Sequence, residues 1–298
     1  MIPQLEQLAR VVSQLCGWAY FFCWTLSFYP QIMLNIRRRT TEGYLPDYPL
    51  LNILGFSCYG ITAAAFLYSP VIRGQYAARH PASPEPTVRF NDLAFAVHAC
   101  LCSIVVYSQF WPRLWGWKPT TAVHTKAGRT SIGIIWGSLF GVVITIGIVL
   151  VSGNTTSDGG HLKWAWIDVI NAISYVKLLV TVFKYTPQAI SNVRRKSTIG
   201  FSIWQVLLDF SGGILSLLQL VIDSALQSTG WRGVTDNPLK FGLANISMLF
   251  DVIFMVQHYI LFGPVEKQSV EGGGHGRRDS AAQSREEGES LLPATEHR

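Results

Sequence analysis

Charged residues are scarce in this sequence. Asp, Glu, Lys and Arg make up 14% of the 298 residues, whereas soluble domains usually carry about 25%. Hydrophobic residues make up 49% of the chain, and the mean hydropathy is +0.27. The scarcity of charge argues against a soluble globular domain, and the abundance of apolar side chains argues against a disordered or collagen-like chain. The composition therefore predicts a polytopic membrane protein.

Cysteines and catalytic motifs are also sparse. The five cysteines fall in apolar runs, are odd in number and lack the paired spacing of metal sites, so we expect small core residues at Cys16, Cys23, Cys58, Cys100 and Cys102. His98 and His258 have no ligand partners at metal spacing. The sequence holds no G-x-S-x-G, H-E-x-x-H, P-loop or dinucleotide-binding motif. We therefore predict neither an enzyme nor a bound metal or organic cofactor.

Seven apolar stretches are each long enough to cross a bilayer, which takes about 20 residues. Because lipid offers no partner to free backbone N–H and C=O groups, a spanning segment is a helix or part of a closed barrel. These stretches are rich in Gly and Leu and lack the alternation of barrel strands. The predicted fold class is all-α, with seven transmembrane helices over residues 8–34, 46–69, 91–111, 131–152, 165–190, 202–228 and 241–263.

Basic residues flank these stretches unevenly. Fifteen Lys and Arg lie in the first, third and fifth connections and the C-terminal tail, against seven on the other side. Because basic residues are retained on the cytosolic side, we expect those connections and the C-terminus in the cytosol, and the N-terminus in a lumen or outside. Topology and lipid headgroups then account for the net charge of +6, so we expect membrane lipid and no nucleic acid as partners.

Three features concern processing and sorting. In this topology Asn154, of Asn154-Thr155-Thr156, lies in a lumenal connection, where a glycan can be attached. The first apolar run lacks a small-residue cleavage pattern and is expected to be a retained helix. Residues 264–298 are polar and predicted to be a disordered cytosolic tail. Within the tail, Glu287, Leu291 and Leu292 match the acidic dileucine signal of sorting adaptors, which indicates a lysosomal or vacuolar address.

An internal repeat organises the chain. Residues 30–43, beginning Pro30-Gln31, align without gaps with residues 187–200, beginning Pro187-Gln188, and seven of the fourteen positions are identical. Both copies end a span on the same side, so the repeats are parallel and need an odd number of linker helices. The sequence thus predicts a 3+1+3 plan: a first three-helix bundle over 1–111, a linker helix over 112–160, a second bundle over 161–263 and the tail.

Each repeated motif is also a candidate hinge. A proline inside an apolar helix removes a backbone donor and clashes with the preceding turn. The neighbouring Gln31 and Gln188 could satisfy the freed backbone groups or contact a ligand. Two matched kinks at Pro30 and Pro187 therefore predict bundles that rock around a central site, although a proline in an apolar helix can also be only a tolerated kink.

Ionisable residues inside the apolar stretches are the main candidate functional residues, because mid-membrane charges are costly and normally face a cavity or a partner. They are Asp92, Lys177, Lys184, Asp209, Asp251 and Lys240. Because burial disfavours a charged carboxylate, Asp209 and Asp251 are suited to take a proton on one side and release it on the other. At the repeat offset of 157, Asn52 occupies the position in the first repeat that Asp209 occupies in the second.

Simpler interpretations of these residues stay open. The two acids could form fixed ion pairs with the lysines of the spans, and Asp92 could cap the start of its helix. Lys177 and Lys184 lie seven residues apart on one helix face and could hold a substrate carboxylate. Lys184 could instead extend to the lipid headgroups.

The doubled Pro-Gln motif on seven spans resembles the PQ-loop transporters. Several strings are similar to the cystinosin family of lysosomal and vacuolar cystine exporters in particular, over about residues 17–262: Ser27-Phe-Tyr-Pro-Gln31, Lys184-Tyr-Thr-Pro-Gln188, Leu207-Leu-Asp-Phe-Ser-Gly-Gly213, Lys240-Phe-Gly-Leu243 and Phe250-Asp251-Val252. The resemblance implies export of L-cystine from an acidic lumen to the cytosol, together with protons as the coupling ion, by alternating access.

The resemblance also implies roles for individual residues. Asp209 is the implied coupling acid, and Asp251 and Asp92 are further proton-relay acids. The implied cystine contacts are Asn52, Lys177, Gln188, Asn192 and Lys240, with Trp24 and Phe28 as walls of the cavity. Where the family usually has Asn, this chain has Gln205, a longer amide among the substrate contacts that alters the fit.

Other functions remain compatible with seven spans. A related PQ-loop exporter of cationic amino acids would also need membrane acids. A non-transporting seven-helix receptor or trafficking scaffold would need neither the repeat nor the buried acids. A sugar uniporter of similar architecture would not need a buried acid pair.

Overall fold

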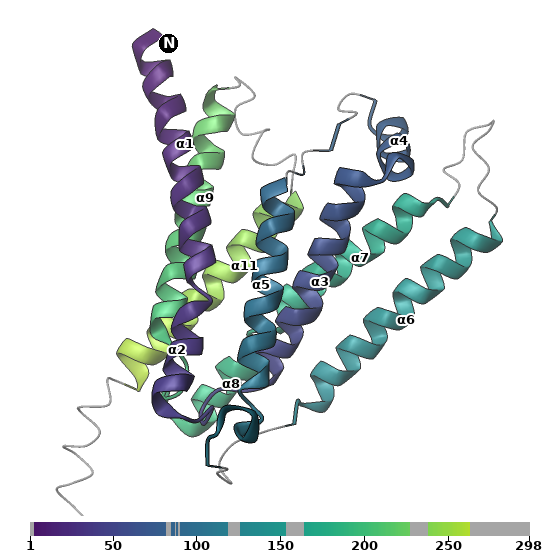
Figure 1. Ribbon diagram of the computed structural model, residues 1–298. Coiled ribbons are helices and arrows are strands. Elements are labelled where there is room, and N and C mark those ends of the chain that lie inside the picture. The colour runs from purple at the N-terminus through teal and green to yellow at the C-terminus, as the bar shows by residue number, and fades with distance from the viewer. Residues whose placement is uncertain are drawn as a thin grey trace, which may run out of the picture.

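The computed structural model describes residues 3–81, 85–86, 88, 90–118, 126–152, 164–226 and 238–262, and all regular structure in these residues is helical (Figure 1). Six segments are long and apolar enough to cross a membrane: Glu6–Arg38, Asp47–Tyr68, Phe90–Ser108, Arg129–Val151, Trp166–Arg195 and Ile203–Ile222. A seventh apolar segment, Asn245–Leu261, is shorter. The predicted all-α, multi-pass membrane fold is confirmed.

The spans are built from helices of uneven length. The elements are α1 (Pro3–Leu26), α2 (Tyr29–Arg38), α3 (Asp47–Tyr68), α4 (Pro70–Arg79), α5 (Phe90–Ser108), η1 (Pro112–Trp115), α6 (Arg129–Val151), α7 (Trp166–Phe183), α8 (Thr186–Arg195), α9 (Ile203–Leu226), α11 (Pro238–Val256) and the π-helical turn η2 (Gln257–Leu261). Helix α4 lies outside the predicted spans, between α3 and α5.

Both proline motifs interrupt their helix, as the sequence predicts. The first span breaks between α1 and α2, and the fifth breaks at Lys184-Tyr185 between α7 and α8. Pro30 and Pro187 then lie in the first turn of the new helix, where a missing N–H costs no hydrogen bond. The breaks are confirmed, whereas their movement as hinges stays a prediction.

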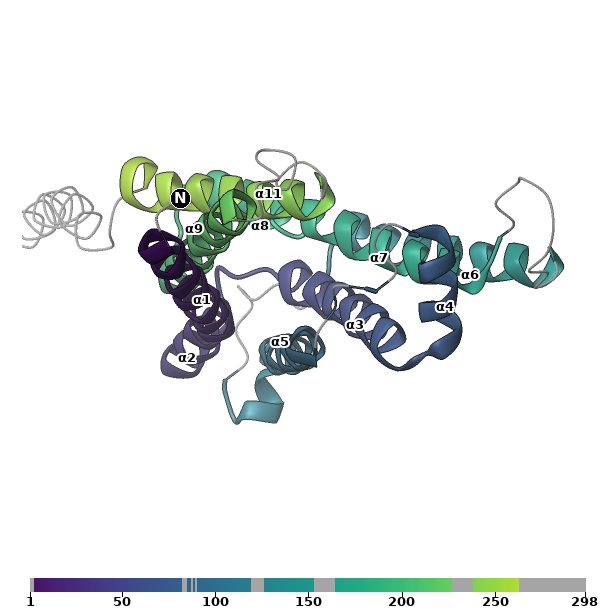
Figure 2. The ribbon, with the colours of Figure 1, turned by 90° about the horizontal axis from the view of Figure 1, so that it is seen from above.

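The two repeats are interleaved rather than packed as separate bundles. Helix α1 of the first repeat packs along α9 of the second, and α7 of the second packs along α3 of the first (Figure 2). Within each repeat, the second and third helices also pack together, as α3 with α5 and α9 with α11. The linker helix α6 packs mainly on α7. The middle of the protein is therefore shared by both repeats.

Two adjacent glycines allow close approach on both sides of α9. A Cβ at Gly212 would lie 2.5 Å from Cδ1 of Trp24 on α1, and a Cβ at Gly213 would lie 2.7 Å from Cγ of Met248 on α11. Only glycine leaves room for both neighbours. These contacts hold α1, α9 and α11 together beside the site described below.

All five cysteines are free thiols, and Cys16, Cys58 and Cys102 are buried, as expected of small core residues. The largest group of buried side chains is an aromatic cluster at the end of the bundle that carries α2 and α8. It consists of Tyr44, Tyr48, Val106, Phe110, Tyr185, Phe201, Val206 and Phe254. We call this end, at the bottom of Figure 1, the PQ end.

Candidate functional site

The two repeats clasp each other at the PQ end through their Pro-Gln glutamines. The Gln31 amide donates to the carbonyl of Gly200 (2.9 Å) and accepts from the N–H of Ser202 (2.8 Å). The Gln188 amide donates to the carbonyl of Gly43 (3.0 Å) and accepts from the N–H of Leu45 (2.9 Å). The four partners are related by the same offset of 157 as the glutamines. We call these eight groups the reciprocal clasp.

A second layer of amides supports each half of the clasp. Gln31 donates to Asn35, which donates to Gln109 (2.7 Å) after the end of α5. In the second repeat, Gln188 donates to Asn192, which donates to Gln257 (3.0 Å) after the end of α11. Gln109 and Gln257 in turn donate to backbone carbonyls of α2 and α8. Each chain of amides thus joins the first and third helices of one repeat to the loop of the other.

The loops of the clasp fit together without space for a side chain. Gly43 and Gly200 have φ values of 91° and 96°, which favour glycine. A Cβ at Gly43 would lie 1.9 Å from the carbonyl oxygen of Ile199, and a Cβ at Gly200 would lie 2.0 Å from that of Glu42. The glycines shared by the two repeats are therefore required for the interlocked loops.

Two predicted substrate contacts, Gln188 and Asn192, belong to the clasp and its supporting amides. Gln188 and Asn192 are fully buried, and their amides bond to the loop of the first repeat and to each other. In this conformation they hold the PQ end closed rather than line a ligand site. Their contact with a substrate stays a prediction that would require the clasp to open.

A polar site lies deeper in the bundle, between the repeats. Nζ of Lys184, in the break after α7, donates to Oδ1 of Asn52 on α3 (3.1 Å). Lys184 is 8% exposed, so the alternative in which it extends to the lipid headgroups is wrong for this conformation. Nζ of Lys177 lies 4.4 Å from the ring centre of Phe56, also on α3. The structure thus brings the two predicted lysines and Asn52 together.

Asp209 lies on the other side of this site and accepts two hydroxyl groups. Its Oδ2 atom accepts from Ser247 on α11 (3.1 Å) and, at longer range, from Tyr185 (3.4 Å). The two hydroxyl oxygens lie 2.8 Å apart. Because each hydroxyl has one hydrogen, Tyr185 donates to Ser247 when Ser247 donates to Asp209, and the 3.4 Å contact is its alternative. The predicted wall residue Trp24 donates from Nε1 to the backbone carbonyl of Asp209 (3.2 Å). Neither Tyr185 nor Ser247 stood out in the sequence.

Asp251 is buried near Asp209, on α11. It is 2% exposed, and its Oδ2 atom has no hydrogen-bond partner among the described residues. The charges of Asp209 and Asp251 both act on Lys184. Within the described part of the chain, however, no ion pair within 4.0 Å joins either acid to Lys177 or Lys184. Fixed pairing with these two lysines is therefore not what holds the acids in this conformation.

Aromatic rings adjoin the polar groups. Phe28 packs against Phe56 (ring centres 5.5 Å apart) and Phe95 (6.3 Å), and Trp24 lies 6.5 Å from Phe95. The two predicted wall residues therefore belong to one apolar surface that continues to Phe56 beneath Lys177. Such a surface beside a few fixed polar groups is typical of a small-molecule site.

Other predicted residues lie apart from this group. Gln205 donates to the hydroxyl of Tyr48 (3.3 Å), at the edge of the aromatic cluster. Asp92 lies in the first turn of α5, at the end opposite the PQ end, and accepts from Tyr59 (3.1 Å). Lys240 lies in α11, but its side chain is outside the described part of the structure. The described residues also do not include Asn154, Glu287, Leu291 and Leu292.

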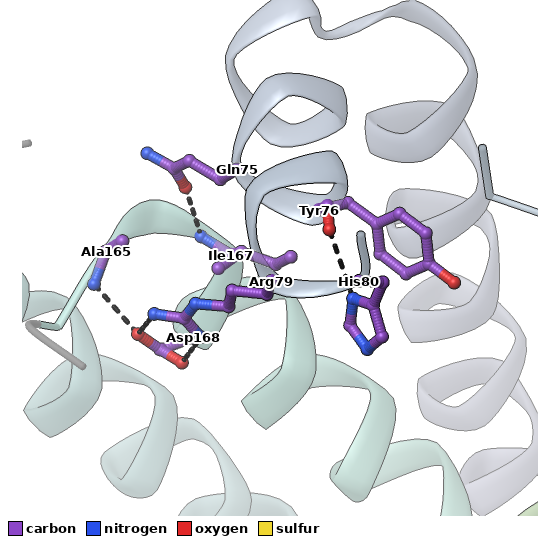
Figure 3. A network of polar contacts seen from close by, with 7 residues as sticks. All are labelled: Gln75, Tyr76, Arg79, His80, Ala165, Ile167 and Asp168. Carbon is purple, nitrogen blue, oxygen red and sulfur yellow. Dashed lines mark hydrogen bonds and ion pairs between the residues drawn. The ribbon is translucent and has the colours of Figure 1, made fainter. Parts of the chain in front are cut away.

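The opposite end has its own contact between the repeats. Helix α4 lies against the start of α7, where Arg79 forms a bidentate ion pair with Asp168, with Nη2 and Oδ2 2.8 Å apart (Figure 3). Gln75 accepts from the backbone N–H of Ile167, and Asp168 accepts from that of Ala165, each at 2.8 Å. Helix α4 therefore caps α7. No sequence pattern singles out Arg79, Asp168 or Gln75.

Matched kinks, interleaved repeats and a buried polar site between them define a PQ-loop membrane protein. The PQ-loop repeat model matches residues 12–72 and 169–229, which contain both Pro-Gln motifs. A cystinosin homolog from Dictyostelium discoideum is 39% identical over 252 residues, which cover 85% of this chain and 82% of the relative. The chain belongs to the cystinosin family.

Three further relatives extend this comparison. A cystinosin homolog from Arabidopsis thaliana is 36% identical over 87% of this chain and 89% of its own length. A cystine transporter from Saccharomyces cerevisiae is 26% identical over 84% of this chain and 94% of its own length. The chain spans only 58% of the length of Drosophila melanogaster cystinosin, to which it is 37% identical. The names of these relatives favour transport over catalysis.

Proposed function

We propose that this protein exports L-cystine from the lumen of a lysosome or vacuole to the cytosol, coupled to protons, by alternating access. The observation that carries the proposal is the site between the repeats, where lysine and amide donors and the carboxylate of Asp209 adjoin one aromatic surface. The naming of a relative as a cystine transporter adds the substrate. The uneven distribution of Lys and Arg supports a cytosolic PQ end.

Cystine has a chemistry that these groups match. It carries two carboxylates and two ammonium groups, joined through an apolar disulfide. Lys177 and Lys184 can bind the carboxylates, and Asn52 can orient one of them through Lys184. Asp209 can accept an ammonium group or a proton, and the surface that contains Trp24 and Phe28 suits the disulfide. Lys240 would add a further donor.

Two acids inside the spans support proton coupling: Asp251, which is buried, and Asp209, which is partly buried. A carboxylate without an ion pair in the membrane is costly, so binding a proton from the acidic lumen lowers the cost of burying it. In the proposed cycle, Asp209 takes this proton when cystine binds, and Asp251 and Asp92 relay it. The reciprocal clasp then opens at the PQ end, as the breaks at Pro30 and Pro187 bend, and releases cystine with the proton.

The test is uptake of radiolabelled cystine into proteoliposomes with and without an inward proton gradient. The proposal predicts uptake that the gradient stimulates and that Asp209→Asn abolishes, in a variant that elutes and melts as the wild type does. Gradient-driven uptake that persists in Asp209→Asn would remove the coupling role from Asp209.

Competition identifies the substrate class in the same assay. Excess unlabelled cystine should displace the label, whereas arginine and lysine should not. Displacement by arginine or lysine would favour the exporter of cationic amino acids. If a folded preparation carries no amino-acid flux at all, the receptor or scaffold alternative replaces transport.

A further inference from the structure

The hydroxyl groups of Tyr185 and Ser247 connect Asp209 to the break between α7 and α8. Tyr185 is the residue before α8 and is 2% exposed. Its ring stacks on Phe250 (centres 5.1 Å apart) and meets Tyr48 edge-on (5.5 Å) within the packing that closes the PQ end. Its hydroxyl bonds to Ser247, which bonds to Asp209. The acid and the interrupted helix are therefore joined by two hydrogen bonds, of 2.8 Å and 3.1 Å.

At the corresponding positions, the first repeat lacks the carboxylate and both hydroxyl groups. At the offset of 157, Phe28 corresponds to Tyr185 and Asn52 to Asp209. The third helices match at an offset of 148, which pairs the supporting glutamines 109 and 257 and places the buried Ala99 opposite Ser247. Both hydroxyls thus occur only in the repeat whose second helix carries the ionisable residue.

We propose that Tyr185 and Ser247 are positioning residues that transmit the charge of Asp209 to the hinge. This inference rests on the proposed function for its proton and deepens it by naming the connection between the acid and the moving helix. While Asp209 is charged, it accepts strongly from Ser247 and holds Tyr185 in the closed packing. When Asp209 takes a proton, these bonds weaken, and Tyr185 with the start of α8 is free to leave.

Other titratable groups act on the same acid and set the background of any pH response. They come from each neighbouring element: Tyr48 on α3, Lys177 on α7, Lys184 in the break and Asp251 on α11. The hydrogen bonds of Ser247 (3.1 Å) and Tyr185 (3.4 Å) are what connect the Asp209 carboxylate to the break. Helix α1 contributes the Trp24 indole, which bonds to the backbone of Asp209 rather than to its carboxylate.

The repeat supplies the variants that test this connection. Ser247→Ala and Tyr185→Phe each install the residue of the first repeat and remove one hydroxyl. We expect each to lower gradient-driven cystine uptake about tenfold, because a hydrogen bond to a charged group is lost. Ser247→Thr keeps the hydroxyl and should restore uptake. The controls Ser211→Ala on α9, whose hydroxyl bonds within its own helix, and Tyr175→Phe, which is exposed, should match the wild type.

Hydrogen exchange tests the connection without relying on a substrate. After correction for intrinsic rates, the amides of residues 184–190 in the wild type should lose protection as the pH falls. Asp209→Asn, Ser247→Ala and Tyr185→Phe should each abolish this pH response. Wild-type uptake together with a wild-type pH response in Ser247→Ala and Tyr185→Phe would overturn the inference.

The two readouts keep the two proposals apart. If the wild type carries no cystine, the proposed function fails, and the exchange measurement alone decides the role of the hydroxyls. If the wild type carries cystine but the exchange of residues 184–190 responds equally in all variants, the function stands and this inference fails. If Ser247→Ala does not fold, Tyr185→Phe carries the same test.

Discussion

The two repeats are alike in the reciprocal clasp and different in the polar site beside it. In the clasp, Gln, Asn and Gly recur in register and make the same hydrogen bonds from both glutamines. In the polar site and the breaks that adjoin it, the corresponding residues differ: Asn52 and Asp209, Ser27 and Lys184, and Phe28 and Tyr185. The comparison teaches that the shared residues close the molecule, whereas the unshared residues provide its charges.

This division has a physical reason. A clasp between repeats of parallel orientation needs the same donors and acceptors on both sides. The glutamine of each repeat binds backbone groups in the loop of the other repeat. A site for a charged ligand and a proton needs an acid and a base at different places, so the two copies must differ there. Interleaving makes this possible, because Lys184 of the second repeat reaches Asn52 of the first.

The largest expected effect comes from the glycines that interlock the loops. Gly43→Ala and Gly200→Ala would each place a Cβ within 2.0 Å of a carbonyl oxygen of the other repeat, at a positive φ. We expect each to lower the free energy of unfolding by about 3–5 kcal/mol, measured as the thermal midpoint in detergent.

Gly116→Ala is the matched control for that measurement. Gly116 also has a positive φ (66°) but has no atom within 4 Å of its Cβ position. It should lose only about 1–2 kcal/mol, the cost of the left-handed backbone alone. If Gly43→Ala were as stable as Gly116→Ala, the interlocked loops would not exist in solution.

A smaller effect is expected at the two clasp glutamines, and it should be larger at Gln31. Gln31→Leu would remove the hydrogen bonds of the buried carbonyl of Gly200 and the buried N–H of Ser202 with Gln31. Gln188→Leu would leave the partly buried N–H of Leu45 without its partner, whereas the carbonyl of Gly43 keeps a hydrogen bond from Arg195 (2.7 Å). We expect losses of about 2–4 kcal/mol for Gln31→Leu and about 1–3 kcal/mol for Gln188→Leu. Gln205→Leu, with one contact at 3.3 Å, should lose less than about 1 kcal/mol. A larger loss for Gln188→Leu than for Gln31→Leu would contradict this account of the PQ end.

The smallest effect is expected at the opposite end. Asp168 raises the pKa of Arg79 through their hydrogen bonds, and a raised folded pKa stabilises the fold at every pH below the range in which arginine titrates. Arg79→Gln should therefore cost about 1 kcal/mol of stability across the working pH range, and less at high salt. A double-mutant cycle with Asp168→Asn isolates the pair, and a coupling energy of zero would show that α4 is held by packing alone.

The sequence predicted the spans and both helix breaks, but not which helices contact one another. Hydropathy located the spans to within a few residues at most ends, and the repeat located both breaks, because the bilayer constrains length and proline constrains the helix. Interleaving was not predictable, since the apolar pattern shows that a helix is buried but not which helix covers it. The role of α4 depends on tertiary contacts that no local pattern encodes.

The site was predicted in part for a similar reason. Lys177, Lys184, Asp209 and Asp251 were identified because a charge inside an apolar run is costly to bury. The structure brings all four into one region. Ser247, Gln109 and Gln257 were missed because the third helices follow an offset of 148 rather than 157. A search of the sequence at that second offset would have found the matching glutamines.

The central claim is that proton coupling belongs to the second repeat. Replacing Asp209 and Asn52, one at a time, by the residue of the other repeat tests this claim most directly. Gradient-stimulated cystine uptake is measured in proteoliposomes for the wild type, Asp209→Asn and Asn52→Asp. The account predicts that Asp209→Asn removes the stimulation entirely. Asn52→Asp should lower uptake both with and without the gradient, because it changes the contact with Lys184, but should keep the ratio of the two, because the proton is taken by the second repeat. Stimulation that survives in Asp209→Asn, or that disappears equally in both variants, would contradict the division of labour between the repeats.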